Sequence, residues 1–344
     1  MPNLWRAPLF ILSCALHAAA QTTSFAPPDG YYDSAVGSGD ALRDQLHEII
    51  DAHIVRSYGG ARSALQEIDE APGDPGSILL AYEARALDVS ELIASGIRGW
   101  DSGRTWNREH TWPRSRGVGS SGADNSDLHA LRPADPGVNS ARSNLNFGGA
   151  FGLPFGRTTD AGAAVWYPGD ADAGLVARSL FYMDVRYDGS DGSTEDLSIL
   201  PGIPSSTGPH IGNLDRLLQW HYQAAPDEFE RRRNDVIYDA YQRNRNPFID
   251  RPEYAWSVFV DQANDSQIAL SGAEVAADGS SSVAVDLGRV LVGAELAPHE
   301  LLLSKSGDAG TYFDATTSGS VTSTLDGRRN AFAMGAAAPR SFAV

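Results

Sequence analysis

Apolar residues recur every three or four positions in several segments of the first two thirds of the chain, as on one face of an α-helix. Asp40 is a suitable N-cap for the first predicted helix, whose buried face carries Leu42, Leu46, Ile49, Ile50 and Ile54. A second follows Asp172 and buries Val176, Leu180, Met183 and Tyr187. Two more carry Leu214, Leu217, Leu218 and Tyr222, and, after Asp227, Phe229, Val236, Ile237 and Ala240. The pattern predicts a mainly helical region.

A turn-rich segment with a different pattern lies between the first two of these helices. Trp100–Gly122 suits a short strand pair and loop, and Leu128–Leu131 is predicted to form the second strand. Pro133 and Pro136 are then expected to break regular strand pairing.

A short helix is predicted next, over Val138–Leu145, with Asn139 near its first turn. The predicted order of elements is therefore strand, strand, helix. Earlier in the chain, the apolar run Ile78–Leu80 fits either a strand or a helix, because it is too short for its periodicity to decide.

Beyond about Asn264 the composition changes to Ser, Gly, Ala and Val, and apolar residues alternate with polar ones as in strands. The alternation is clear over Val283–Leu287 and Leu301–Leu303. The segment VDLGRVLVGAELAPHELLLSKSGDAG is similar to the opening strands of immunoglobulin-like repeats, although the chain ends before a complete sandwich of that kind. The sequence therefore predicts an α+β protein, with a mainly helical domain at residues 27–262 and a small all-β module at residues 265–344.

Residues 1–20 have the features of a secretory signal peptide. A basic residue precedes an apolar run, Ala7–Leu16, and small residues, Ala18 and Ala20, follow where signal peptidase reads. We expect cleavage after Ala20, which removes the only cysteine, Cys14. In an alternative interpretation the ILSC segment is a lipoprotein signal and Cys14 carries lipid. No later apolar run is long enough to cross a bilayer, so the product is expected to be secreted or periplasmic.

The charge of the whole chain argues against broad electrostatic attraction to nucleic acid. The formal net charge is −17 and the sequence pI is about 4.8, whereas nucleic-acid-binding proteins usually present basic patches. Residues 101–150 differ from the rest, with six Arg against five carboxylates. Basic residues can therefore cluster locally, and the acidity elsewhere mainly favours solubility.

Chemistry-bearing side chains are concentrated in two motifs, WNREHTWPRSR at residues 106–116 and DLHALRPADPGVNSARSNLNFG at residues 127–148. Glu109 and Asn139 offer oxygens that suit a hard cation such as Mg²⁺, and would leave most of its coordination shell to water and phosphate oxygens. His110 titrates near neutral pH and can take a proton from water. These groups are sufficient for phosphodiester cleavage with one cation.

Each of these residues also has an ordinary structural explanation. A lone histidine is more often a satisfied surface or core residue, and an asparagine at the start of a helix is often a cap. Glu109 and His110 would point to opposite faces of a strand unless it bends or bulges. His129 fits a functional role and a structural bond to a loop carbonyl equally well. The run Arg231–Asp235, with acidic neighbours, is predicted to be a solvated and salt-bridged helix face.

The two motifs resemble those of the bacterial endonuclease I family, in the ββα-metal or His-Me finger nuclease superfamily. Further similar segments, over roughly residues 27–259, are PPDGYYDSA, LHEIIDAH, ARSLFYMDVRY and LLQWHYQAAPDEFERRRNDVIYDAYQRNRNPFID. The resemblance implies that Glu109 and Asn139 hold the metal and His110 is the general base. It also implies that Arg142 contacts phosphate. Ala130 departs from the family pattern, since DLHAL stands where DLHNL or DLHHL is commoner.

Together these observations predict a secreted endonuclease that hydrolyses DNA with little sequence preference, with RNA as a further candidate substrate. The expected cofactor is Mg²⁺, with Mn²⁺ or Ca²⁺ as alternatives. A hypothesis of another class is a surface or matrix protein that binds nucleic acid or calcium through an inactive nuclease scaffold. A protease or esterase is disfavoured because the sequence has no GxSxG or HExxH motif.

Overall fold

The computed structural model describes residues 10–14, 25–90, 100–260, 266–271, 274–275, 281–285, 298–307, 309–314, 323–324, 329–332 and 339–343. The chain divides into two compact units, residues 22–263 and residues 1–21 with 264–344. The larger unit contains every candidate catalytic and metal-binding residue. The expected cleavage site after Ala20 lies outside the described residues.

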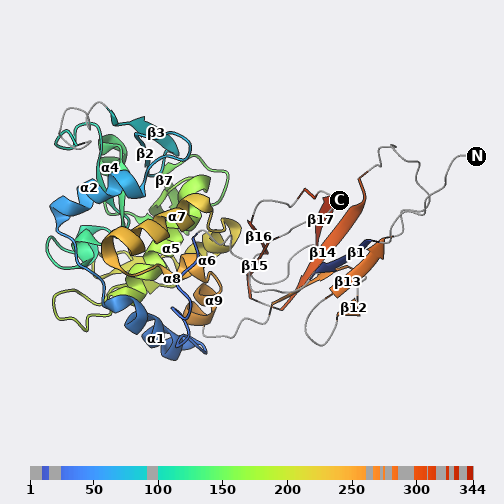
Figure 1. The fold of residues 1–344 in the computed structure, drawn as a ribbon. Coiled ribbons are helices and arrows are strands. Elements are labelled where there is room, and N and C mark those ends of the chain that lie inside the picture. The colour runs from blue at the N-terminus through green and yellow to red at the C-terminus, as the bar shows by residue number, and fades with distance from the viewer. Residues whose placement is uncertain are drawn as a thin grey trace, which may run out of the picture. The chain divides into compact units, whose positions relative to one another are not determined.

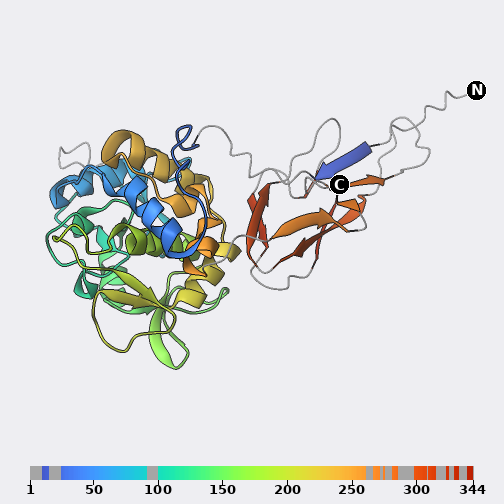
Figure 2. The same cartoon turned by 90° about the horizontal axis from the view of Figure 1, so that it is seen from below.

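The larger unit is mixed α and β, and its helices surround one central helix, α5 (Figure 1 and Figure 2). The α-helices are α1 (Gly39–Asp51), α2 (Tyr58–Ile68), α4 (Pro136–Arg142), α5 (Asp170–Arg186), α6 (Leu214–Gln223), α7 (Glu228–Val236), α8 (Pro247–Asp250) and α9 (Tyr254–Phe259). Shorter turns are η2 (Arg114–Arg116), η3 (Asp124–Ser126) and the π-helical η4 (Ile237–Gln242). Every residue of α5 from Asp172 to Arg186 is buried, because α1, α6 and α8 pack against it. The sequence predicted only one buried stripe on this helix.

Short strands complete the larger unit. β2 (Ser77–Leu80) and β3 (Arg85–Asp88) form an antiparallel pair, so the run Ile78–Leu80 is a strand. β6 (Asn146–Phe147), β8 (Ala163–Tyr167) and β7 (Gly156–Asp160) form a three-stranded sheet in that order. β9 (Ser198–Leu200) and β10 (His210–Gly212) pair in parallel.

The strand that carries the first motif is β4 (Asn107–His110), which pairs antiparallel with β5 (Leu131–Ala134). The predicted second strand, Leu128–Leu131, was placed three residues too early, because the Ala130 amide bonds to the Asp127 carbonyl and forms a turn instead. The expectation that Pro133 breaks pairing was also wrong. It lies within β5, in a sheet of only two strands, where a missing amide proton is tolerated.

The helix after β5 is α4, which begins two residues before the predicted start. Asp135 caps it: its carboxylate accepts the amides of Gly137 and Val138 at 2.8 and 3.2 Å. The next residue, Pro136, suits the first helical position, where its missing amide proton is not needed. The helix ends at Arg142, before Ser143 with a φ of 56°. The chain order strand, strand, helix is as predicted.

The region around β4 and β5 is fixed by one hydrophobic cluster. Trp106, which directly precedes β4, is fully buried, and Leu131 of β5 is fully buried as well. Their partners come from α2, β2 and the start of η4 and include Ala61, Ala64, Leu65, Ile68, Ile78, Leu80 and Ile237. Each fully buried Leu or Ile contributes roughly 1.5–3 kcal/mol to folding, so the strand pair is held rigidly.

Helix α7 carries Arg231–Asp235, which were predicted to form a solvated face, but part of this run is buried. Arg233 is only 3% exposed. Its Nη2 donates to the carbonyls of Leu128 and Leu131 at 2.6 Å, and its Nε lies 3.2 Å from Asp69. The prediction of a solvated face was therefore wrong for this residue, which instead ties α7 to the segment leading into β5. Asp227 caps this helix, since its carboxylate accepts the Glu230 amide at 2.9 Å.

Among the described residues of the smaller unit, the regular secondary structure is all strand. They are β1 (Phe10–Cys14), β11 (Gln267–Leu270), β12 (Glu274–Val275), β13 (Ser281–Val285), β14 (Glu300–Ser306), β15 (Thr311–Asp314), β16 (Arg329–Phe332) and β17 (Arg340–Ala343). Its sheets have the orders β1-β13-β12, β11-β14-β17 and β15-β16. A removable leader and an immunoglobulin-like class remain predictions. Within the described residues, no helix is both long and apolar enough to span a bilayer.

Candidate active site

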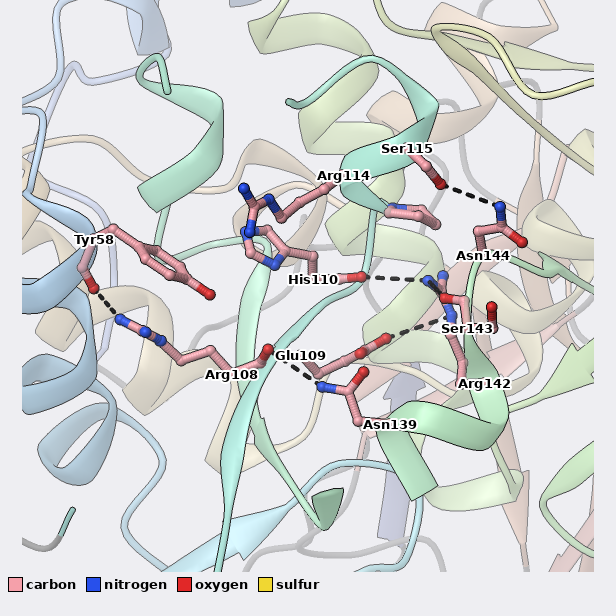
Figure 3. A pocket seen from close by; sticks show the side chains of 11 residues that line it. Tyr58, Arg108, Glu109, His110, Arg114, Ser115, Asn139, Arg142, Ser143 and Asn144 are labelled. Carbon is pink, nitrogen blue, oxygen red and sulfur yellow. Dashed lines mark hydrogen bonds and ion pairs between the residues drawn. The ribbon is translucent and has the colours of Figure 1, made fainter. Parts of the chain in front are cut away.

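A pocket of about 390 Å³ opens where β4, the turn after it and α4 meet (Figure 3). All four residues singled out from the sequence, Glu109, His110, Asn139 and Arg142, contribute to its wall. The other lining residues are Tyr58, Arg108, Pro113, Arg114, Ser115, Ser143 and Asn144. The tertiary structure therefore brings the two sequence motifs into one cavity.

Glu109 and His110 leave β4 in different directions, as the pleat of a strand requires (Figure 3). The register with β5 is continuous from Asn107 to His110, so no bulge is needed. The His110 ring stacks against the Tyr58 ring, with centroids 5.6 Å apart and planes at 24°. The Glu109 carboxylate points toward Asn139 and Arg142. Glu109 and His110 were expected to need a bend or bulge to act together. They do not need one, because both line the same pocket from different sides.

His110 is held in a defined tautomer. Its Nε2 lies 3.0 Å from the backbone oxygen of Asn125, and a carbonyl can only accept, so Nε2 carries the proton. No described residue bonds to Nδ1, which is therefore the free acceptor. Burial lowers the pKa of His110 to about 4, and the positive charges of Arg114 and Arg108 act in the same direction. The ring is neutral at ordinary pH and can receive a proton.

Glu109 is 2% exposed, and the described residues contact only one of its two carboxylate oxygens. The Tyr82 hydroxyl donates to Oε1 at 2.7 Å, and Arg142 Nε lies 3.4 Å from the same atom. Among the described residues, Oε2 has no hydrogen-bond partner. Burial raises the pKa of Glu109, while Arg142 and the Tyr82 hydroxyl oppose that rise. A cation near Oε2 would further favour the ionised carboxylate.

Asn139 presents its side-chain oxygen because both amide protons are used elsewhere. Nδ2 donates to Asn107 Oδ1 at 2.7 Å and to the Arg108 carbonyl at 3.2 Å. The alternative that Asn139 is a helix cap is wrong, since Asp135 fills that position. The amide is therefore fixed with its oxygen available as a ligand.

Arg142 is 1% exposed and holds the pocket wall together. Nη2 donates to the Thr111 carbonyl at 2.7 Å, and Nη1 donates to the Ser143 carbonyl at 3.1 Å. The guanidinium also lies 4.5 Å from the centre of the Phe147 ring. With its ion pair to Glu109, these contacts fix the direction of the Glu109 carboxylate. A contact between Arg142 and phosphate remains a prediction.

The residues present fit a divalent cation with few protein ligands. Within the described chain, no group of three or more His, Cys, Asp or Glu side chains could hold a metal. The pocket instead offers Oε2 of Glu109 and Oδ1 of Asn139, two hard oxygens to which no described residue donates a hydrogen bond. Mg²⁺ commonly takes one or two protein oxygens and keeps the rest of its octahedral shell for water and phosphate.

His129 has a structural role and does not line the pocket. Its Nε2 lies 3.3 Å from the Asn244 carbonyl, and its ring is 3% exposed. The neighbouring Asp127 accepts the hydroxyls of Tyr182 and Tyr187 at 2.8 and 2.7 Å. These bonds anchor the segment directly after η3. That turn supplies the Asn125 carbonyl bonded to His110.

Sequence reasoning missed the Asn125 carbonyl, the Tyr82 hydroxyl and the Tyr58 ring as contributors to the site. Tyr82 lies 27 positions from its partner Glu109 and belongs to a different hairpin. Asn125 contributes a backbone atom, which no side-chain motif reveals. The role of Asn107, whose Oδ1 accepts a hydrogen bond from the Asn139 amide, was also not predicted, although Asn107 lies inside the first motif.

The buried His129 should make folding stability depend on pH. Burial lowers its pKa to about 4, whereas an unfolded histidine titrates near about 6.5. Between these two pKa values the unfolded chain binds a proton that the folded protein does not, so the free energy of unfolding falls as the pH falls. The effect of His129 on that free energy is complete above about pH 6.5 and is lost toward pH 4, about 3 kcal/mol in all. Urea unfolding at steps from neutral to acidic pH should show a smaller pH dependence for H129Q. H299Q, at an exposed position, should behave as the unsubstituted protein; identical profiles for all three would contradict this account.

Comparison with known proteins gives two kinds of match. The model of the Endonuclease I family matches residues 38–253, which contain every residue lining the pocket. The chain is 42% identical over 245 residues to an extracellular ribonuclease of Bacillus subtilis (strain 168), covering 70% of this chain and 82% of that protein. It is 42% identical over 243 residues to an extracellular ribonuclease of Bacillus amyloliquefaciens, covering 69% and 81%. The resemblance inferred from the two motifs is confirmed.

Proposed function

Because this chain belongs to the endonuclease I family and is a nuclease that hydrolyses phosphodiester bonds, we propose that it is a secreted, metal-dependent enzyme that cuts both DNA and RNA. One observation carries the proposal. A neutral imidazole shares a pocket with one oxygen each of Glu109 and Asn139, and within the described part of the chain neither Nδ1 nor these two oxygens has a partner. A base for water and ligands for one cation are thereby combined at one place.

His110 acts as the general base. Its Nδ1 removes a proton from water while the water oxygen bonds to phosphorus, and the bond from phosphorus to one bridging oxygen breaks. The leaving oxygen takes its proton from solvent. The bond from Nε2 to the Asn125 carbonyl keeps the tautomer correct and stabilises the ring once it is protonated.

Glu109 and Asn139 would hold the cation, for which Mg²⁺ is the expected ion. When bound, the ion supplies stabilisation of the negative charge that develops on the phosphate and on the leaving oxygen. Tyr82 and Arg142 orient the Glu109 carboxylate, and Asn107 orients the Asn139 amide. Arg142 is a positioning residue in these contacts, and we retain phosphate as its further partner.

Both polymers are proposed as substrates because the reacting groups contact only features that DNA and RNA share. Water is the nucleophile, so a ribose 2′-hydroxyl is not required. The two Bacillus relatives are named as extracellular ribonucleases, which supports RNA as a substrate here. Contacts to phosphate and sugar carry no direct sequence information, so little base preference is expected.

Secretion is proposed from the same relatives and from the predicted signal peptide. Both relatives are named extracellular, and residues 1–20 have the organisation of a cleavable leader. Attachment of lipid at Cys14 remains the alternative. The two outcomes differ in whether the mature chain begins at Gln21 or at a modified Cys14, which mass spectrometry of the exported protein distinguishes.

The protein beginning at Gln21 is expected to nick plasmid DNA and to shorten RNA in Mg²⁺. Excess EDTA should stop both reactions, because the pocket relies on a cation to stabilise charge. Gel electrophoresis of both polymers with Mg²⁺, Mn²⁺ or Ca²⁺ measures this directly. Undiminished cutting in EDTA would refute the metal requirement, and cutting of one polymer alone would refute the dual substrate range.

A further inference from the structure

Three arginines lie in a row from the pocket wall outward, and the local structure explains their alignment. Tyr58 and Arg62 are four positions apart on α2, so they share one face of that helix. Arg108 and His110 are two positions apart on β4, so they share one face of that strand. Arg114 follows in η2. Arg108 and Arg114 line the pocket, whereas Arg62 lies outside it.

Aromatic rings hold these guanidinium groups. Arg108 lies 3.5 Å from the centre of the Tyr58 ring and 5.3 Å from that of Trp100. Arg62 lies 5.5 Å from the Trp100 ring, and Arg114 lies 5.9 Å from the Tyr58 ring. Trp100 therefore connects Arg62 to Arg108, and Tyr58 connects Arg108 to Arg114. Figure 3 shows Tyr58, Arg108 and Arg114 around the His110 ring.

The positive charges in this row are not neutralised. Elsewhere in the larger unit, arginines such as Arg178 and Arg245 pair with carboxylates. Within the described chain, no carboxylate lies within ion-pair distance of any of the three arginines in the row. Burial and the charges of its two neighbours lower the pKa of Arg108, although it remains protonated.

An aromatic ring and a carboxylate can both hold an arginine side chain in place, but only the carboxylate neutralises its charge. Both restrict the side chain, but the ring leaves the full charge available to a ligand. A row of unpaired like charges repels itself until an anion binds between them. In a chain of net charge −17, such a row is where a polyanion can approach.

We propose that Arg62, Arg108 and Arg114 form a phosphate-binding track that carries the backbone of a polynucleotide past the pocket. The proposal rests on the nuclease function described above and extends it. Arg108 and Arg114 contact phosphates at the cleavage site, and Arg62 contacts a phosphate farther along the strand. The enzyme thereby favours polymers over short diesters, because only a polymer reaches Arg62.

The test compares R62Q, R62K and the control R157Q in the whole protein. Arg157 is exposed and lies outside the pocket and the track. For R62Q, we expect KM for a long RNA to rise about 3- to 10-fold while kcat changes less than twofold. The slope of log kcat/KM against log salt should become shallower by roughly 0.7 to 0.9, as for the loss of one phosphate contact. R62K should keep most of that slope, because it keeps the charge.

Bis(p-nitrophenyl) phosphate serves as the short diester, since it carries one phosphate and cannot span the track. Its KM should be unaffected by R62Q beyond twofold. The track is wrong if R62Q and R157Q have the same KM for RNA. It is also wrong if R62Q raises KM for the short diester as much as it raises KM for RNA. Failure of the proposed function is seen separately, because the unsubstituted protein would then hydrolyse neither substrate.

Discussion

Replacement of His110 by alanine is expected to lower kcat on plasmid DNA and on RNA by about 1,000-fold, because a positioned general base typically contributes 10²- to 10⁴-fold. We expect no second base among the described lining residues, since Tyr82 and Arg142 occupy Glu109 Oε1 and the proposed cation would occupy Oε2. Single-turnover cutting rates at saturating Mg²⁺ measure the loss. Substrate binding should change little, because the track arginines and the metal ligands remain in place.

Chemical rescue separates this role from a structural one. The alanine variant leaves a space beside Tyr58, and added imidazole can enter it and accept the proton. We expect partial recovery of the rate with imidazole and an unchanged circular dichroism spectrum. Full activity of H110A without imidazole would show that another group removes the proton.

Replacement of Glu109 by glutamine, or of Asn139 by alanine, is expected to reduce activity at limiting Mg²⁺ by at least about 100-fold. Changes in the residues that merely orient a metal ligand already cost 10- to 100-fold, so loss of a direct ligand should cost at least as much. Glu109→Gln keeps the shape of the side chain and removes the charge. The Mg²⁺ concentration that gives half-maximal rate should rise for both variants.

Asn144→Ala provides the matched control, because Asn144 also lines the pocket but its amide donates to the Ser115 hydroxyl at 3.2 Å. That variant should keep the Mg²⁺ dependence of the unsubstituted protein. Glu109→Gln and Asn139→Ala with unaltered Mg²⁺ titrations would place the metal elsewhere. Isothermal titration with Mn²⁺ gives a second readout that does not depend on cutting.

The pocket is locally basic, although the chain as a whole is acidic and its substrate is a polyanion. Its lining holds three arginines, Arg108, Arg114 and Arg142, against the single carboxylate of Glu109. The divalent cation that we propose would make this region more positive still. The net charge of −17 thus describes the molecule as a whole, whereas substrate approach depends on the local field.

The sequence alone was sufficient to choose the candidate site residues and to locate most of the helices. Glu109, His110 and Asn139 could be chosen because few residue types bind a hard cation or titrate near neutral pH, and because two motifs carried them together. Helical periodicity located α1, α5, α6 and α7, since the spacing of buried positions along a helix is a local property.

Only the tertiary structure decided which groups surround those residues. The Asn125 carbonyl fixes the His110 tautomer, and the Tyr82 hydroxyl binds Glu109 across 27 positions of the chain. Arg233 was predicted to be solvated, yet it is buried against the segment before β5, because a charged helix position can satisfy its donors on backbone carbonyls of a distant loop. Local periodicity records which face of an element is buried, whereas the partner on that face is set by packing between segments far apart in sequence.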